Sequence, residues 1–432
     1  MCTQDIQVFP KPRAGLASRI PHAGFAVLFF LWTAAPTSAQ NPAGKTYDSF
    51  KVEVSRAEEV AFNQMLNSGA VRDEAVFRKG IQKRILDLSL PENKTRMADL
   101  RRAIKNQLQR AGQKGGQEAH AKANELLLLY LPKIAAEDRW HPGARYNWAL
   151  LLGQLDTQEP DLRGLGAQPM AAALQPLLVL LADTKQIDAV HVATMVGILR
   201  HAETGLATPQ SDTVAAAMID YLARLEQQTQ ESPGLRAARG QAWLEMRAIN
   251  VLGALGVTND NVLTALGQRM ADASRPLWLR CSAARALGNL DVSGNVQVDA
   301  QQSQQLAEGL SNLVVTVSQQ NADRRSLRWS LECVKDGLTG GAATKIAAPH
   351  DESSKRWAGG IQNLLVLFED KTLSTDELLA ARLKQEVEDI RKGQAVKPAA
   401  LTDAQTDTTA ENSDPPPAAA SPTQENPLNP FQ

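Results

Sequence analysis

The stretch that decides the fold is RCSAARALGNLD, residues 280–291, where small residues, leucine and glycine follow one another in a fixed order. Residues 145–156, RYNWALLLGQLD, align with it without a gap and share its Arg, second Ala, Leu-Gly, Leu and Asp. Residues 245–256 (EMRAINVLGALG) and 189–199 (AVHVATMVGIL) keep the helical centre of the motif. A short motif that recurs in this way is typical of repeat architectures.

Each copy carries one marker glycine, and the four are Gly153, Gly197, Gly253 and Gly288, separated by 44, 56 and 35 residues. The small residues of the motif predict close approach of a neighbouring helix, and glycine near the helix end is expected to relax the backbone for a tight exit. One helical hairpin cannot bury its apolar face alone, so several hairpins should stack into a continuous core.

Helical periodicity runs through residues 55–392, with no convincing alternation of apolar and polar residues, which predicts an all-α chain. Each marker helix has a candidate partner helix, and these lie at 171–182, 213–225, 261–270 and 306–317. Four hairpins follow. A fifth can join 306–317 to 326–338, and residues 361–368 can begin another.

The stretch 266–290 resembles the HEAT-repeat family, especially its bilin-lyase-like subclass, through Asp272, Pro276, Leu279-Arg280, Ala283-Ala284 and Leu287-Gly288. The resemblance covers about residues 135–340 and implies an irregular α-solenoid. It also implies that an Asp in the turn and an Arg in the second helix tie adjacent repeats together. Asp272 with Arg280 and Asp138 with Arg145 match this pattern, whereas Ala189 and Glu245 stand where the other two copies should carry the Arg.

A helical N-terminal region is expected over residues 55–134, which resemble no named family. Ser55 and Glu58 have the spacing of a capping box, and Gly69 supplies the stop, so a helix should cover 56–67. A second apolar face carries Phe77, Ile81, Ile85 and Leu88. Pro91 is expected to open a third helix, and residues 126–131 belong to a further one.

The array from 135 to 393 should close with a helix that starts at the capping sequence of residues 374–377 and ends at Gly393. Residues 394–432 are rich in Ala, Pro, Thr and Asp, with Phe431 as the one aromatic residue, and such a composition is typical of a disordered tail. A linker is expected over 40–54.

Residues 1–39 have the pattern of a secretory signal: three basic residues, the apolar run 23–35, and a small residue, Ala39, before the expected cleavage site. About 13 apolar residues reach roughly 20 Å as a helix, short of a hydrocarbon core of about 30 Å. The mature protein is therefore expected to be exported, either periplasmic or secreted, with no transmembrane segment.

The chain has 46 basic and 47 acidic residues and a net charge of -1, which gives no electrostatic reason to expect nucleic acid as partner. Residues 394–432 hold five acids and one Lys, so the acidity is concentrated in the tail. After cleavage two cysteines remain, Cys281 and Cys333. They can form one bridge, but their apolar helical setting favours two buried thiols.

No local motif for catalysis, cofactor or metal binding is recognisable. The five histidines beyond residue 39 never recur at helical ligand spacing, and residues 338–345 (LTGGAATK) lack the strand and the final glycine of a phosphate loop. Neighbouring acids such as Glu58 and Glu59 are typical of solvated helix faces. No cofactor is predicted, and the chain is not expected to be an enzyme.

Residues 234–290 carry seven arginines against three acids, and an Arg-rich inner face can clamp carboxylates or phosphates. Inter-repeat ties explain the same arginines. Trp243, Trp278 and Trp329 begin successive second helices, either as core anchors, which is the favoured interpretation, or as an aromatic strip along a groove.

The sequence thus predicts an exported scaffold or protein-binding adaptor whose partner is another protein or an anionic macromolecule, contacted around Arg247, Arg280 and Arg285. Alternatives are a helical-toroid enzyme that processes polysaccharides and a cofactor-handling protein like the bilin lyases. Five per cent aromatic residues argue against the first alternative, and the absence of an evident nucleophilic Cys argues against the second.

Overall fold

The computed structural model describes residues 39–40, 46–113, 117–160, 166–232, 236–291, 299–320, 322–341 and 352–393. The expected signal sequence (apart from Ala39) and the tail from 394 to 432 lie outside the described residues. So does the second half, residues 342–345, of the glycine-rich segment at 338–345.

The chain is all-α, as predicted, with fifteen α-helices in the described residues. Their bounds are α1 Arg56–Ser68, α2 Glu74–Leu86, α3 Met97–Gln113, α4 Gln117–Ala136, α5 Pro142–Gly153, α6 Leu174–Ala182, α7 Asp188–Glu203, α8 Thr208–Glu231, α9 Ala238–Leu255, α10 Asp260–Ala271, α11 Leu277–Gly288, α12 Ala300–Ser318, α13 Arg324–Thr339, α14 Glu352–Val366 and α15 Asp376–Arg391. Two antiparallel strand pairs accompany them: β1 (Ala39–Gln40) with β2 (Thr46–Tyr47), and β3 (Asp156–Gln158) with β4 (Gln168–Pro169).

Helix α1 starts and ends at the expected capping residues. The Ser55 hydroxyl accepts a hydrogen bond from the Glu58 amide at 3.2 Å, the Glu58 carboxylate accepts one from the Ser55 amide at 2.7 Å, and Gly69 ends α1 with φ 76°. The prediction for Pro91 was wrong. Residues Pro91–Asn93 form a 3-10 turn and α3 starts only at Met97, because the bonds of this turn close on Leu90 and Pro91.

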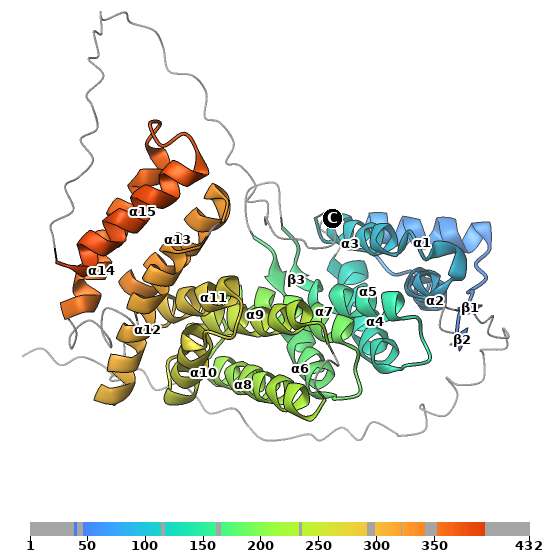
Figure 1. Cartoon of the computed structure of the whole chain (residues 1–432). Coiled ribbons are helices and arrows are strands. Elements are labelled where there is room, and N and C mark those ends of the chain that lie inside the picture. The colour runs from blue at the N-terminus through green and yellow to red at the C-terminus, as the bar shows by residue number, and fades with distance from the viewer. Residues whose placement is uncertain are drawn as a thin grey trace, which may run out of the picture.

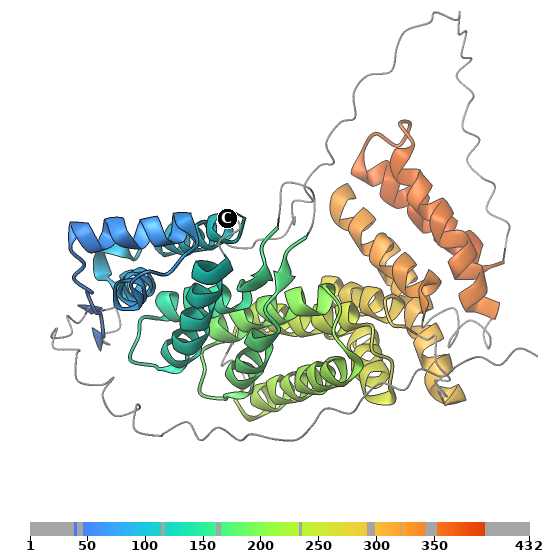
Figure 2. The same cartoon turned by 180° about the vertical axis from the view of Figure 1, so that it is seen from behind.

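The helices from α4 to α13 form two layers (Figures 1 and 2). In one layer α5, α7, α9, α11 and α13 lie side by side, each packed on the next, and in the other α4, α6, α8, α10 and α12 follow the same order. Each helix of the second layer also packs on the helix that follows it in sequence. We call the side of the first layer that faces away from the second the inner face and define it by Tyr146, Val196, Trp243, Arg247, Trp278 and Arg285.

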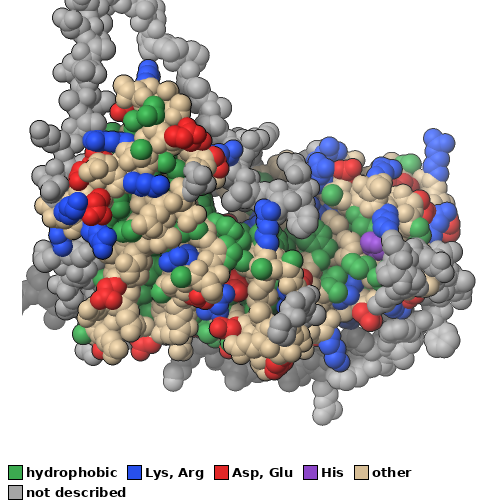
Figure 3. Space-filling model, viewed as in Figure 1, with side chains coloured by type: hydrophobic (Ala, Val, Ile, Leu, Met, Phe, Trp, Pro, Cys, Tyr) green, Lys and Arg blue, Asp and Glu red, His purple; other side chains and the backbone are tan. Residues whose placement is uncertain are grey.

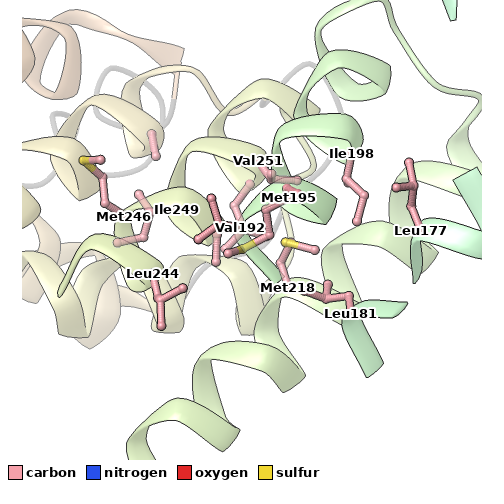
Figure 4. Close-up of a cluster of buried hydrophobic side chains, with 14 of the residues drawn as sticks. Leu177, Leu181, Val192, Met195, Ile198, Met218, Leu244, Met246, Ile249 and Val251 are labelled. Atoms are coloured by element: carbon pink, nitrogen blue, oxygen red, sulfur yellow. The ribbon is translucent and has the colours of Figure 1, made fainter. Parts of the chain in front are cut away.

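One hydrophobic core runs through the described molecule, from Phe62 in α1 to Ile390 in α15. Figure 4 shows its centre, where Leu177 and Leu181 of α6, Met195 and Ile198 of α7, and residues of α8 and α9 meet. Cys281 and Cys333 are buried in this core as free thiols.

The marker glycines are contact points between helices of the first layer. A Cβ added to Gly153 would lie 2.5 Å from the Cα of Gly197, and one added to Gly253 would lie 2.9 Å from the Cα of Ala286. At Gly288 it would lie 2.0 Å from the carbonyl oxygen of Asp336 in α13. None of the four has a positive φ, so the expected role in a tight helix exit is replaced by close backbone approach.

The C-terminal helices close the described part. α14 packs on α12 and α13, and α15 packs on α12 and α14. The N-cap of α15 is Thr375, whose hydroxyl accepts from the Leu378 amide at 3.3 Å, so the helix starts one residue later than expected from Ser374. Gly393, with φ 72°, follows its end.

Candidate macromolecule-binding face

Arg247 and Arg285 lie on the inner face, whereas the third predicted contact residue, Arg280, points into the molecule. Arg280 is 7% exposed, and its Nε donates to the carbonyl oxygen of Met270 at 2.8 Å, at the end of α10. The last carbonyls of a helix have no partner within the helix, and this arginine supplies one. Arg280 therefore stabilises its own hairpin and is not available on the inner face.

Arg145 of α5 has the equivalent role in the hairpin formed by α4 and α5. Its Nε donates to the carbonyl oxygen of Ala135 at 3.0 Å, at the end of α4, and a second guanidinium nitrogen donates to Gln186 in the turn before α7. Where the Arg is missing in α7, His191 bonds the carbonyl oxygen of Asp183 at 3.1 Å instead. In α9 the substitute Glu245 is buried and accepts from Arg275.

Arg247 has no partner of opposite charge among the described residues. Its guanidinium lies 4.7 Å from the ring centroid of Trp243, one turn earlier on α9, and its Nε is shielded from solvent and bonded to nothing. Burial lowers the pKa of Arg247, with the nearby Tyr146 phenol opposing the effect. A charged donor that is desolvated without a partner costs about 1–3 kcal/mol, so this group is suited to receive an anion from outside.

Arg285 lies at the edge of a groove of about 340 Å³ between α11, α13 and α14. Its Nε donates to the Asp336 carboxylate at 3.0 Å, and its guanidinium lies 5.8 Å from the ring centroid of Trp329. Leu365 and Val366 supply apolar lining, and Lys335 lines the groove without an ion pair to any described residue. The groove combines cations, acids and apolar surface.

The three tryptophans singled out in the sequence are neither fully buried core anchors nor a fully exposed aromatic strip. Trp243, Trp278 and Trp329 are partly buried against the core, whereas Trp140 and Trp148 are completely buried. The favoured interpretation as core anchors is therefore incomplete. Each ring packs on the core with one part and leaves another part at the surface.

Four of the five helices of the first layer carry few acids, and the fifth, α13, carries Glu332 and Asp336 at the groove. Helices α5 and α11 contain none, the one acid of α9 is the buried Glu245, and those of α7, Asp188 and Glu203, lie at its two ends. In Figure 3, hydrophobic side chains are visible near the middle of the molecule, with Lys and Arg side chains beside them. This surface has the charge and polarity to bind an anionic partner with apolar parts.

Arg101 and Tyr146 belong beside Arg247 and were not predicted. Arg101 of α3 donates to the amide oxygens of Asn147 at 3.0 Å and Gln154 at 2.7 Å, and it has no carboxylate partner in the described part. Burial lowers its pKa too, opposed by Tyr146. Arg101 lies outside the repeat motif, so no repeat-based signal could have placed it next to α5.

A buried ionic cluster follows β3 and was also missed. Asp156 is completely buried and accepts from Lys105 Nζ at 2.5 Å and from Arg200. Glu159 accepts from the same Lys105 Nζ at 2.6 Å and contacts His120 Nε2 at 3.2 Å. Burial alone would raise the pKa of Glu159, but the bonds from His120 and Lys105 outweigh it and the pKa lies below its ordinary value.

Both carboxylates are saturated by cations, so the cluster ties β3 to α3, α4 and α7. Its members come from positions 105, 120, 156, 159 and 200, and no local spacing in the sequence could have joined them. No group of three or more His, Cys, Asp or Glu side chains in the described ranges is arranged to hold a metal ion. Nor do those ranges contain a helix that is both long and apolar enough for a membrane span.

No family model matches the chain, and neither a curated protein nor a solved structure is significantly similar to it.

Proposed function

We propose that this chain is an exported HEAT-like α-solenoid that binds another macromolecule through its inner face and acts as a scaffold or adaptor without catalysing a reaction. Export is inferred from the pattern of residues 1–39. The partner is a protein or another anionic macromolecule of the exported compartment.

The solenoid assignment is supported by the order of the helices. Successive hairpins repeat one packing relation, and the glycines of the motif lie where helices of neighbouring hairpins touch. Stacked hairpins of this kind offer one continuous surface, which is the usual binding surface of helical-repeat proteins. Arg145 and Arg280 support the HEAT likeness, although their bonds go to helix-end carbonyls and Asp272 pairs with Arg275 at 3.1 Å.

The observation that carries the binding proposal is Arg247. Its charge is partly desolvated, stacked on Trp243 and without a described carboxylate partner, and its own helix α9 carries one acid, the buried Glu245. Arginine on an aromatic ring is a common anchor at protein interfaces. A partner carboxylate or phosphate would satisfy the guanidinium.

A glycosidase-type function is less well supported. Such a site needs two carboxylates, one of them free to hold a proton. The buried pair Asp156 and Glu159 is bound by Lys105 and Arg200, so neither carboxylate is free to hold a proton.

The test is capture of a partner from the exported protein fraction by the tagged full chain, quantified by mass spectrometry. We expect Arg247→Glu to reduce the captured partner about tenfold or more, as loss of a central charge contact does at many interfaces. Arg285→Glu should weaken capture less, because Asp336 already neutralises Arg285.

Arg391→Glu is the matched control, since Arg391 is 67% exposed on α15, which does not pack on α9. Its capture should equal that of the wild type. Equal capture by the Arg247→Glu variant would contradict the proposal.

A further inference from the structure

The inner face offers cationic groups that the described residues leave without an acid. Arg247 and Arg101 flank the Tyr146 phenol from α9 and α3, and Lys335 lines the groove between α13 and α14. None of the three has an ion pair among the described residues. Trp329 of α13 and Arg285 and Trp278 of α11, the two helices between α14 and α9, are partly exposed.

The C-terminal tail, residues 394–432, has more acidic than basic residues. Residues 394–432 hold Asp403, Asp407, Glu411, Asp414 and Glu425 against Lys397, a net charge of -4. Residues 40–393 hold 42 basic and 41 acidic residues, so the body is balanced. The surface around Arg247 and Arg101 and the acidic tail are thus complementary in charge, whereas the groove at Lys335 also contains Glu332, Asp336 and Glu369.

We propose that residues 394–432 bind in cis along the inner face, with their carboxylates on Lys335, Arg247 and Arg101. The occupant of this face in the absence of a partner is therefore the tail. The inference rests on the proposed function, since it makes the tail a competitor of the external partner, and it assigns to that partner the same chemistry: an extended, carboxylate-bearing chain.

The reach of the tail fits this path. It leaves Gly393, which lies near Arg356 of α14, and α9 is three helix contacts away through α13 and α11. At the usual spacing of 8–10 Å between packed helices this is about 30 Å. An extended chain rises about 3.1 Å per residue, so Asp403 can travel about 30 Å from Gly393 and Asp407 about 43 Å.

The spacing of the acids fits as well. Asp403, Asp407, Glu411 and Asp414 are three or four residues apart. In an extended conformation this is about 9–12 Å, close to the distance between neighbouring helices of the first layer. Consecutive carboxylates can therefore reach successive helices of the first layer without coiling of the chain, and two of the target cations, Lys335 of α13 and Arg247 of α9, are separated by one helix, α11.

The tail contact is tested in the full chain by double electron–electron resonance, which measures the distance between two spin labels. The labels are placed at Asn250→Cys, on the exposed side of α9, and at Thr409→Cys, between two tail acids, with Cys2→Ser. Cys281 and Cys333 are buried and stay unlabelled. We expect a short, defined distance population at low salt that is lost at high salt.

Two variants decide the outcome. The short-distance population should disappear in Arg247→Glu and in a tail with Asp403→Asn, Asp407→Asn, Glu411→Gln and Asp414→Asn, and it should persist in Arg391→Glu. A broad distribution in every variant, or equal loss in Arg391→Glu, would overturn the inference.

Partner capture separates this result from the proposed function. If the tail binds as inferred, the neutralised tail should capture several-fold more partner than the wild type. A tail contact that depends on Arg247, together with partner capture that does not, would refute the proposed function and leave the tail contact standing. The reverse pattern would refute the tail contact alone.

Discussion

Arg280 and Arg247 lie on neighbouring helices, and their side chains have opposite surroundings. Arg280 is bonded to the end of α10, whereas the Nε of Arg247 is bonded to nothing. A side chain that satisfies a buried carbonyl contributes to folding, and an unpaired, half-buried charge opposes it. The two residues should therefore respond differently to the same substitution.

We expect Arg280→Met to lower the free energy of unfolding by about 1–3 kcal/mol, because it leaves the Met270 carbonyl without its partner. Arg247→Met should leave that free energy unchanged or raise it, since methionine covers Trp243 without a charge to desolvate. Urea denaturation followed by circular dichroism checks both variants. A larger loss in Arg247→Met than in Arg280→Met would show that Arg247 is a structural residue.

His201 gives the stability of the molecule a dependence on pH. Burial, reinforced by the charge of Arg200, lowers its pKa from 6.5 to about 4. The unfolded chain therefore binds a proton at this residue more readily than the folded one, and stability is lost as the pH falls from about 6.5 to about 4. Above pH 6.5 the contribution is fully present.

The stability of the His201→Gln variant should depend less on pH between about 6.5 and 4. Between pH 7 and pH 4.5, His201 should lower the free energy of unfolding of the wild type by on the order of 2–3 kcal/mol. This contribution should be absent from the variant. Denaturation midpoints at the two pH values measure it. Parallel shifts in both proteins would exclude His201 as the source.

At the scale of the element, the glycines decide how closely the helices of the first layer pack. In Gly153→Ala the new methyl group would meet the backbone of Gly197, which cannot turn aside as a side chain can. We expect a loss of about 1–3 kcal/mol, typical of overpacking. In the matched variant Gly240→Ala, within α9, no atom lies within 4 Å, and the higher helix propensity of alanine should be neutral or stabilising by up to about 1 kcal/mol.

Urea denaturation of the two glycine variants tests this account of the motif. The free energy should fall in Gly153→Ala and stay constant or rise in Gly240→Ala. A neutral Gly153→Ala variant would mean that the recurring glycine is not required for the contact between α5 and α7.

For the molecule as a whole, local signals in the sequence predicted local structure. The capping box at Ser55, the stop at Gly69 and the partner helix at 261–270 are reproduced in α1 and α10. The repeat motif identified the helices of the first layer because alanine and glycine at fixed positions are needed wherever two helix backbones approach. β3 and β4 are too short to give a periodic signal.

The candidate face was predicted only in part, since burial of a side chain depends on which helix covers it. Arg247 and Arg280 both follow the start of a marker helix, yet the first faces outward and the second meets the end of α10. Arg101 reaches the face from α3, and Lys105 reaches Asp156 over 51 residues. Contacts between distant parts of the chain leave no pattern in a single sequence.

The central claim, that the inner face binds the partner, is tested most directly by site-specific photo-crosslinking in the exported fraction. A photoreactive residue replaces Asn250 or Trp278 on the inner face, or Val179 of α6, which is 59% exposed in the second layer. We expect adducts of one macromolecule from Asn250 and Trp278 and none from Val179. Adducts from Val179 with none from the inner face would contradict it.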